Sequence, residues 1–147
     1  MKIYLGTDHA GYDLKEKLKQ FLVEDLGHDV TDFGAESFDE GDDYPDFIVP
    51  VARAVATDDG SFGIVFGGSG QGEAMSANRE HGVRAVVYYG GPTEIITLSR
   101  EHNNANILSI GARFISLEEA KNVVKLWLGT EFSGNERHQR RINKLDK

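Results

Sequence analysis

Short apolar runs alternate with longer amphipathic segments along the whole chain. The apolar runs predict strands at residues 2–6, 29–33, 64–66, 84–89 and 107–110. The segments between them predict helices at 12–26, 44–57, 73–78, 93–102 and 116–129, and a last basic helix follows the break at residues 133–134. Leu14, Leu18 and Leu22 show the helical spacing of the first segment, which Gly27 would cap, and Ser116 begins a capping box for the fifth.

Strands that alternate with helices of this length are typical of a parallel sheet covered on both faces by helices, which is an α/β fold. The chain has 147 residues without an internal repeat or linker, which predicts one domain spanning residues 1–147. Ligands of such folds bind at the carboxyl ends of the strands. The polar turns at residues 7–11, 67–73, 89–91 and 111–113 each follow a strand, so they should share this edge of the sheet.

Composition narrows the possible functions. Apolar residues make up 39% of the chain and charged residues 27%, as in a globular protein, and no apolar run approaches the ~20 residues of a membrane span. No signal-peptide core follows Met1, so we expect a cytoplasmic protein. The absence of cysteine excludes disulfides, thiolate metal sites and a thiol nucleophile. A net charge of −8 argues against nucleic acid as a partner, whereas the basic cluster at 137–147 favours an anion.

A glycine-rich loop, GGSGQG at residues 67–72, connects the third strand to the following helix. Its glycine spacing does not match the dinucleotide fingerprint, and a phosphate-binding P-loop would have lysine where Glu73 stands. The loop can still offer backbone N–H groups to an anion. An oxyanion hole beside a carboxylate, with Ser69 as a further donor, fits these residues.

Glu73 has two interpretations. A carboxylate in the first turn of a helix is stabilised by the helix dipole, which is a structural role. A carboxylate beside donors for a developing oxyanion can also remove a proton α to a carbonyl. Asp8 and His9 likewise form either a helix N-cap with a surface histidine or part of a site at the ligand edge.

The remaining polar candidates are also open to a structural interpretation. His102 and Asn103 end the fourth predicted helix, where a histidine is a common cap, and the acidic segment 36–43 is typical of a solvated loop. The five histidines lack the spacing of a metal site. Arg113 follows a strand, and Arg137 and Arg141 share one helical face, so they form either a solvated basic end or a clamp for a phosphate. A tail helix after a glycine break could also reach a neighbouring subunit.

Several segments together resemble the sugar-phosphate isomerases of the ribose-5-phosphate isomerase B type, a family that includes galactose-6-phosphate isomerase subunits. They are GTDHAG at 6–11, DYPDF at 43–47, GGSGQGEAMSANR at 67–79, SREHNNAN at 99–106, GAR at 111–113 and RHQRRI at 137–142. They span the chain in the family's order. The resemblance implies a Rossmann-like α/β/α sandwich that works as a homodimer, possibly as a dimer of dimers, with active sites shared between subunits and with no metal or cofactor.

The resemblance also implies a role for each candidate residue. One branch of the family uses a cysteine as its base, at the position of Gly67, and the other uses a glutamate, here Glu73. In this branch Glu73 would move the proton, while His102 and Asp8 would open the sugar ring. The enediolate and sugar contacts would fall to Gly68, Ser69, Gly70, Gln71, Gly72 and Asn103, and the phosphate contacts to His9, Arg113, Arg137 and Arg141; Tyr44 and His138 also match the substrate-binding pattern.

The function expected from this resemblance is interconversion of ribose 5-phosphate and ribulose 5-phosphate through a cis-enediol. Gln71 stands where the glutamate branch often has asparagine, and the segment 88–92, YYGGP, departs from the family's pattern. Both lie near the expected sugar site, which leaves a tetrose 4-phosphate, or a hexose 6-phosphate such as allose or galactose 6-phosphate, as alternative substrates. A sugar-phosphate sensor that keeps the arginines without catalysis is an alternative from another class.

Overall fold

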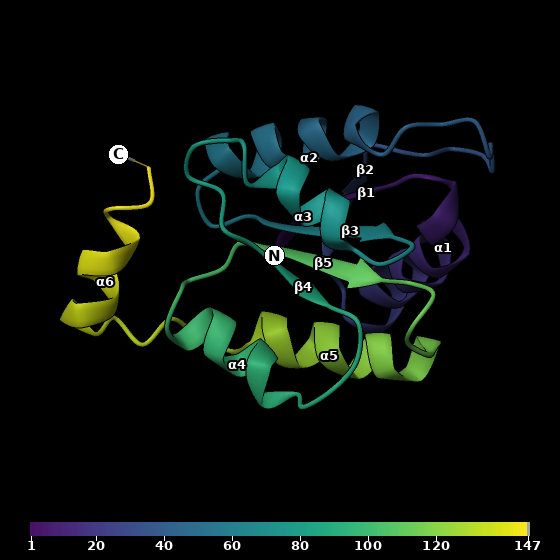
Figure 1. Cartoon of the computed structure of the whole chain (residues 1–147). Coiled ribbons are helices and arrows are strands. Elements are labelled where there is room, and N and C mark those ends of the chain that lie inside the picture. The colour runs from purple at the N-terminus through teal and green to yellow at the C-terminus, as the bar shows by residue number, and fades with distance from the viewer. Residues whose placement is uncertain (147) are drawn as a thin grey trace.

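The computed structural model describes residues 1–146 and has one parallel sheet between layers of helices (Figure 1). Its strands are β1 (Lys2–Thr7), β2 (Asp29–Asp32), β3 (Phe62–Gly67), β4 (Ala85–Tyr88) and β5 (Ile107–Gly111). They are all parallel and lie in the order β2-β1-β3-β5-β4. The predicted α/β fold and its strands are confirmed, with β3 two residues longer at its start and one at its end than the apolar run suggested.

The helices are α1 (Tyr12–Gln20), α2 (Pro45–Thr57), α3 (Gln71–Ala77), α4 (Glu94–Glu101), α5 (Leu117–Gly129) and α6 (Glu136–Ile142). The first predicted helix differs in one respect, because a wider π-helical turn at Phe21–Asp25 continues α1. Gly27, with φ of 67°, ends this segment as predicted. Half of the predicted capping box at the start of α5 is confirmed, since the Ser116 hydroxyl accepts the Glu119 N–H at 3.2 Å, while the Glu119 carboxylate accepts the Tyr88 hydroxyl.

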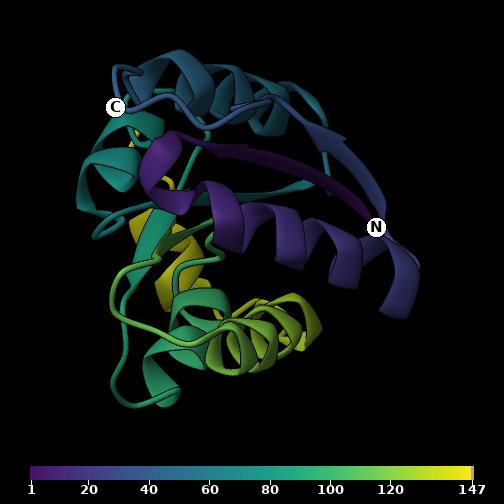
Figure 2. The same ribbon diagram turned by 90° about the vertical axis from the view of Figure 1, so that its right-hand side faces the viewer.

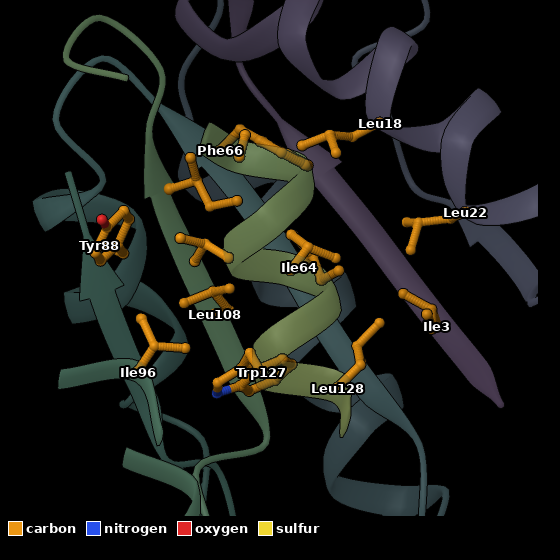
Figure 3. Close-up of a cluster of buried hydrophobic side chains, with 14 of the residues drawn as sticks. Ile3, Leu18, Leu22, Ile64, Phe66, Tyr88, Ile96, Leu108, Trp127 and Leu128 are labelled. Atoms are coloured by element: carbon orange, nitrogen blue, oxygen red, sulfur yellow. The ribbon is translucent and has the colours of Figure 1, made fainter. Parts of the chain in front are cut away.

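Each face of the sheet has its own apolar core. On one face α1, α4 and α5 cover β1, β3 and β5 through the cluster in Figure 3, which includes Leu18, Ile96 and Trp127. On the other face α2 and α3 contribute Ile48, Val51 and Ala77, among others. Burying one such aliphatic side chain stabilises the fold by about 1.5–3 kcal/mol, so the two cores hold the strand ends in fixed relative positions.

The direction of the strands separates the loops into two sets. All five strands end at one edge of the sheet, and helices that run back across the sheet end at the opposite edge. The arrowhead of β5 points away from α6 in Figure 1. In Figure 2 the right-hand side of Figure 1 faces the viewer, and α6 lies behind the sheet. We call these the carboxyl edge and the amino edge. Within residues 1–146, no helix combines the length and apolar character needed to cross a membrane.

Candidate active site

The glycine loop at residues 67–72 lies at the carboxyl edge, between β3 and α3. Gly70 has φ of 78°, and a Cβ added there would lie 3.1 Å from the backbone nitrogen of Gly111, so this position requires glycine. The buried Ser109 hydroxyl donates to the carbonyl oxygen of Gly70 at 2.6 Å. The Ser69 oxygen accepts the N–H of Gln71 at 3.3 Å. The loop is thus held against β5, with its own serine turned toward the start of α3.

Glu73 lies in the first turn of α3 and is only 4% exposed. A Cβ added to Gly67 would overlap the Glu73 carboxylate, so this carboxylate occupies the space that any side chain at position 67 would need. Burial raises the pKa of Glu73, the Asp8 carboxylate raises it further, and a hydrogen bond from the backbone N–H of Glu73 itself opposes the change. A buried carboxylate with a raised pKa is suited to accept and return a proton.

Asp8 follows β1 and is 8% exposed, and its carboxylate accepts the N–H of Ala10 at 3.0 Å. The structural interpretation of Asp8 as a helix cap is therefore correct, for a short 3-10 turn at His9–Gly11. The Asp8 carboxylate also contributes to the raised pKa of Glu73, at the same edge of the sheet. Capping and a place in the site are thus compatible.

His9 contacts Asp42, a residue that the sequence did not single out. Its backbone N–H lies 3.1 Å from Oδ1 of Asp42, and its ring Nδ1 lies 2.7 Å from the same oxygen. The acidic segment 36–43 was expected to be a solvated loop, which is wrong for Asp42, because its side chain is only 10% exposed. One polar side-chain atom each of Asp8, His9 and Asp42 lies within 4.8 Å of the other two, so the three side chains meet at this edge.

Arg113 and Tyr44 complete the group at the carboxyl edge. The Arg113 guanidinium lies 3.2 Å from the position that a Cβ of Gly68 would take. The Tyr44 hydroxyl lies 2.9 Å from the position that a Cβ of Gly72 would take. Arg113 and His9 line a hollow of about 520 Å³. The structure therefore brings together Glu73, the glycine loop and cationic side chains that can hold an anion. The members of this carboxyl-edge group are Asp8, His9, Tyr44, Gly68, Ser69, Gly70, Gln71, Gly72, Glu73 and Arg113.

The other predicted site residues form a second group at the amino edge, where α4 ends and α6 lies. His102, Asn103, His138 and Arg141 line a cavity of about 200 Å³. The His102 and His138 rings stack with their centroids 4.3 Å apart, and Nε of Arg137 lies 3.4 Å from Nε2 of His138. Burial, followed by the nearby His102 and the two arginines, lowers the pKa of His138, which is 6% exposed.

The two groups of one chain do not meet. The first follows the ends of β1, β3 and β5, and the second follows the end of α4 and belongs to α6, at the other end of the strands. A strand of five or six residues is roughly 15–20 Å long, which is several times the length of a hydrogen bond. Glu73 and His102 of the same chain therefore cannot contact one small substrate.

The whole chain matches known proteins. A model of the family described as Ribose/Galactose Isomerase matches residues 3–145. The chain belongs to this ribose/galactose isomerase family. Ribose-5-phosphate isomerase B of Mycobacterium tuberculosis strain H37Rv is 43% identical over 145 residues, which are 99% of this chain and 88% of that protein. The protein of the same name from Escherichia coli K12 is 41% identical over 98% of this chain and 93% of its own length.

Solved structures of ribose-5-phosphate isomerases B have the same fold. The Thermotoga maritima structure is 41% identical, with a TM-score of 0.91 over 99% of this chain and 97% of that one. The Mycoplasma genitalium structure, described with bound ribulose-5-phosphate, is 37% identical, with a TM-score of 0.92 over 98% of this chain and 93% of that one. The resemblance noted from the sequence motifs and the Rossmann-like fold that it implied are both confirmed.

Proposed function

We propose that the chain is a metal-independent isomerase that interconverts ribose 5-phosphate and ribulose 5-phosphate, with Glu73 as the base. The observation that carries this proposal is the Glu73 carboxylate, which is buried beside the glycine loop in the space left by Gly67. The names of the relatives and the ribulose-5-phosphate described for the Mycoplasma genitalium structure support the choice of sugar.

The reaction moves one proton between neighbouring carbons. In the open-chain aldose, Glu73 takes the proton from C2, the electrons of that bond form the C1–C2 double bond, and the C1 carbonyl oxygen becomes an enediolate oxygen. The proton of the C2 hydroxyl passes to the C1 oxygen, and Glu73 then returns its proton to C1 as the C2 oxygen becomes the ketone. The N–H groups of residues 68–72 and the Ser69 hydroxyl are the donors to the enediolate, a kind of interaction that typically lowers a barrier by about 3–4 kcal/mol per donor.

The remaining residues bind the ends of the substrate. His9 and Arg113 bind the phosphate at the carboxyl edge, where they line one hollow. Tyr44 and Gln71 contact the sugar beside the glycine loop. Asp8, together with His102, opens the furanose ring by moving a proton between the ring oxygen and the C1 hydroxyl.

The amino-edge group takes part only if it comes from a second copy of the chain. His102, Asn103 and His138 would then face Glu73 of the partner subunit, and Arg137 and Arg141 on α6 would add to its phosphate site. We therefore propose a homodimer, possibly paired into a dimer of dimers, in which each site combines the carboxyl edge of one chain with the amino edge of the other. The separation of the two groups within one chain supports this arrangement.

Mixed dimers test the shared site. Glu73→Gln and His102→Asn should each inactivate the homodimer, but mixing the two variants after dissociation should restore activity, because one of the two sites then has both wild-type residues. The expected recovery is up to about a quarter of the wild-type activity for random mixing. A mixture that stays inactive, although mass spectrometry shows heterodimers, would contradict the proposal that the site is shared between two chains.

Solvent exchange tests the reaction itself. Purified protein with ribose 5-phosphate in deuterated water should form ribulose 5-phosphate that carries deuterium at C1, detectable by NMR. Glu73→Gln should lower the rate by at least ~10² with phosphate affinity retained. Binding without deuterium incorporation would identify a sugar-phosphate sensor, and a comparison of kcat/KM among tetrose, pentose and hexose phosphates would detect a different preferred sugar.

A further inference from the structure

The acidic loop before α2 holds a carboxylate with no role in the reaction proposed above. We propose that Asp42 is a positioning residue that keeps His9 in its doubly protonated form, so that Nε2–H of the His9 ring binds the substrate phosphate as a charged donor. This inference rests on the proposed role of His9 in phosphate binding and adds the residue that controls it.

The contacts of Asp42 fix the orientation of the His9 ring. A single oxygen, Oδ1, lies 3.1 Å from the His9 backbone nitrogen and 2.7 Å from ring Nδ1. A carboxylate accepts hydrogen bonds and cannot donate them, so Nδ1 must carry a proton for this contact to form. Nε2 is then the ring nitrogen left for another ligand, and His9 lines the hollow together with Arg113.

Burial gives the pair its charge state. Oδ2 of Asp42 is buried without a hydrogen-bond partner among residues 1–146, and the side chain is 10% exposed. A buried carboxylate is costly unless an opposite charge lies beside it, and the His9 imidazolium is in contact with it. The hydrogen bond that the His9 ring donates to Asp42 is the largest effect on the pKa of His9 and raises it, while burial of the ring lowers it.

The other charged groups near His9 come from several elements. Asp8 after β1 raises the pKa of His9, and Arg113 after β5 lowers it. Asp13 of α1 and Glu40 of the acidic loop line the same hollow. An anion enters this acidic surrounding more easily if Asp42 is neutralised by His9 than if it adds another free negative charge. In this pair the Asp42 carboxylate, which alone would repel a phosphate, instead holds the His9 ring that donates a hydrogen bond to it.

Asp42→Asn separates the charge from the geometry. An asparagine oxygen at position 42 can still accept both His9 N–H groups, so the loop keeps its contacts, but the group no longer favours a charged ring. Affinity for inorganic phosphate, measured by titration calorimetry, should equal or exceed that of the wild type near pH 5.5, where the His9 ring of both proteins is protonated and the variant lacks one negative charge. Near pH 7, just above the ordinary histidine value of 6.5, it should be weaker by up to roughly tenfold, the difference between a charge-assisted and a neutral hydrogen bond.

The ratio of the phosphate affinities of variant and wild type does not depend on the titration of phosphate itself, since both proteins bind the same ligand at each pH. Asp43→Asn is the matched control, because it removes an exposed carboxylate one residue away, and its effect should be the same at every pH. Asp42→Glu should restore part of the affinity near pH 7. In turnover assays Asp42→Asn should raise KM more than it lowers kcat, and it should have little further effect in a His9→Asn background.

A measurement on the wild type keeps the inference testable if the variant folds poorly. NMR titration of the His9 ring should show a proton on Nδ1 and a pKa above the ordinary 6.5. A pKa at or below that value, or an affinity ratio that does not change with pH, would overturn the role of Asp42. Phosphate binding is measured without turnover. A protein that does not isomerise ribose 5-phosphate would therefore fail the solvent-exchange test, while the phosphate-affinity test of Asp42 would still give a result.

Discussion

Gly67→Ala should inactivate the protein without unfolding it. The backbone of Gly67 does not have a left-handed φ, so alanine fits the local conformation, but its Cβ would overlap the Glu73 carboxylate. To regain an ordinary van der Waals separation of about 3.5 Å, the carboxylate must move by roughly 1 Å or more. A displacement of that size at a reacting group costs about 10² in rate, equivalent to about 2.7 kcal/mol of barrier. We expect kcat to fall by this factor while KM changes little, because the phosphate contacts lie elsewhere.

The assay compares initial rates of ribulose 5-phosphate formation with thermal unfolding of the same samples. Gly129→Ala is the matched control, since a Cβ at the end of α5 meets no atom within 4 Å, and it should keep wild-type activity. In a Glu73→Gln background, Gly67→Ala should cause little further loss, because the displaced group is already inactive. A Gly67→Ala protein with wild-type kcat would refute the argument that the carboxylate must occupy this space to react.

Further predictions concern the same carboxylate and the charged groups around it. Since the base must be ionised and its pKa is raised, kcat should decline on the acid side at a pH above the ordinary glutamate value of 4.5, as a pH–rate profile would show. The raised pKa also means that stability is lost as pH rises from the ordinary value of 4.5 through the raised pKa of the folded protein, so Glu73→Gln should raise the Tm at pH 7.5 and not at pH 4; no difference in Tm between variant and wild type at pH 7.5 would contradict this. Arg113→Ala should raise KM by about tenfold or more with a smaller change in kcat, measured by steady-state kinetics, and unchanged KM would exclude it from the phosphate site. Dialysis against EDTA should leave turnover intact, and loss that returns with added metal would contradict a metal-independent reaction.

The fold could be predicted from the sequence because its signals are local. Apolar runs such as 107–110 and helical spacing such as that of Leu14, Leu18 and Leu22 identify strands and helices without knowledge of the rest of the chain. The π-helical turn at Phe21–Asp25 had no such signal, since its apolar spacing continues that of α1. Pairing order was beyond the sequence pattern as well, because the insertion of β5 between β3 and β4 depends on which helices pack together.

The carboxyl edge of the site could be predicted for a similar reason. Asp8 and Arg113 lie within two residues of a strand end, Glu73 begins the helix after the loop that follows β3, and the ends of parallel strands lie at one edge. Asp42 could not be found in this way, because it lies in an acidic loop 33 residues from His9, and nothing in the composition of that loop distinguishes it from its solvated neighbours. Only the folded chain shows that this one carboxylate turns inward.

The sequence alone could have predicted that His102 lies at the amino edge. This position is also the strongest structural argument for a site shared between two chains. His102 and Asn103 follow a helix rather than a strand, and a helix that connects two parallel strands ends where the next strand begins. The carboxyl edge and the amino edge of any such sheet are separated by the length of the strands. A motif with catalytic residues after β3 and after α4 can therefore work as one site only if two chains combine. In the proposed dimer, the His102 ring at the end of α4 and the His138 ring on α6, which stack on each other, would face the glycine loop of the partner together.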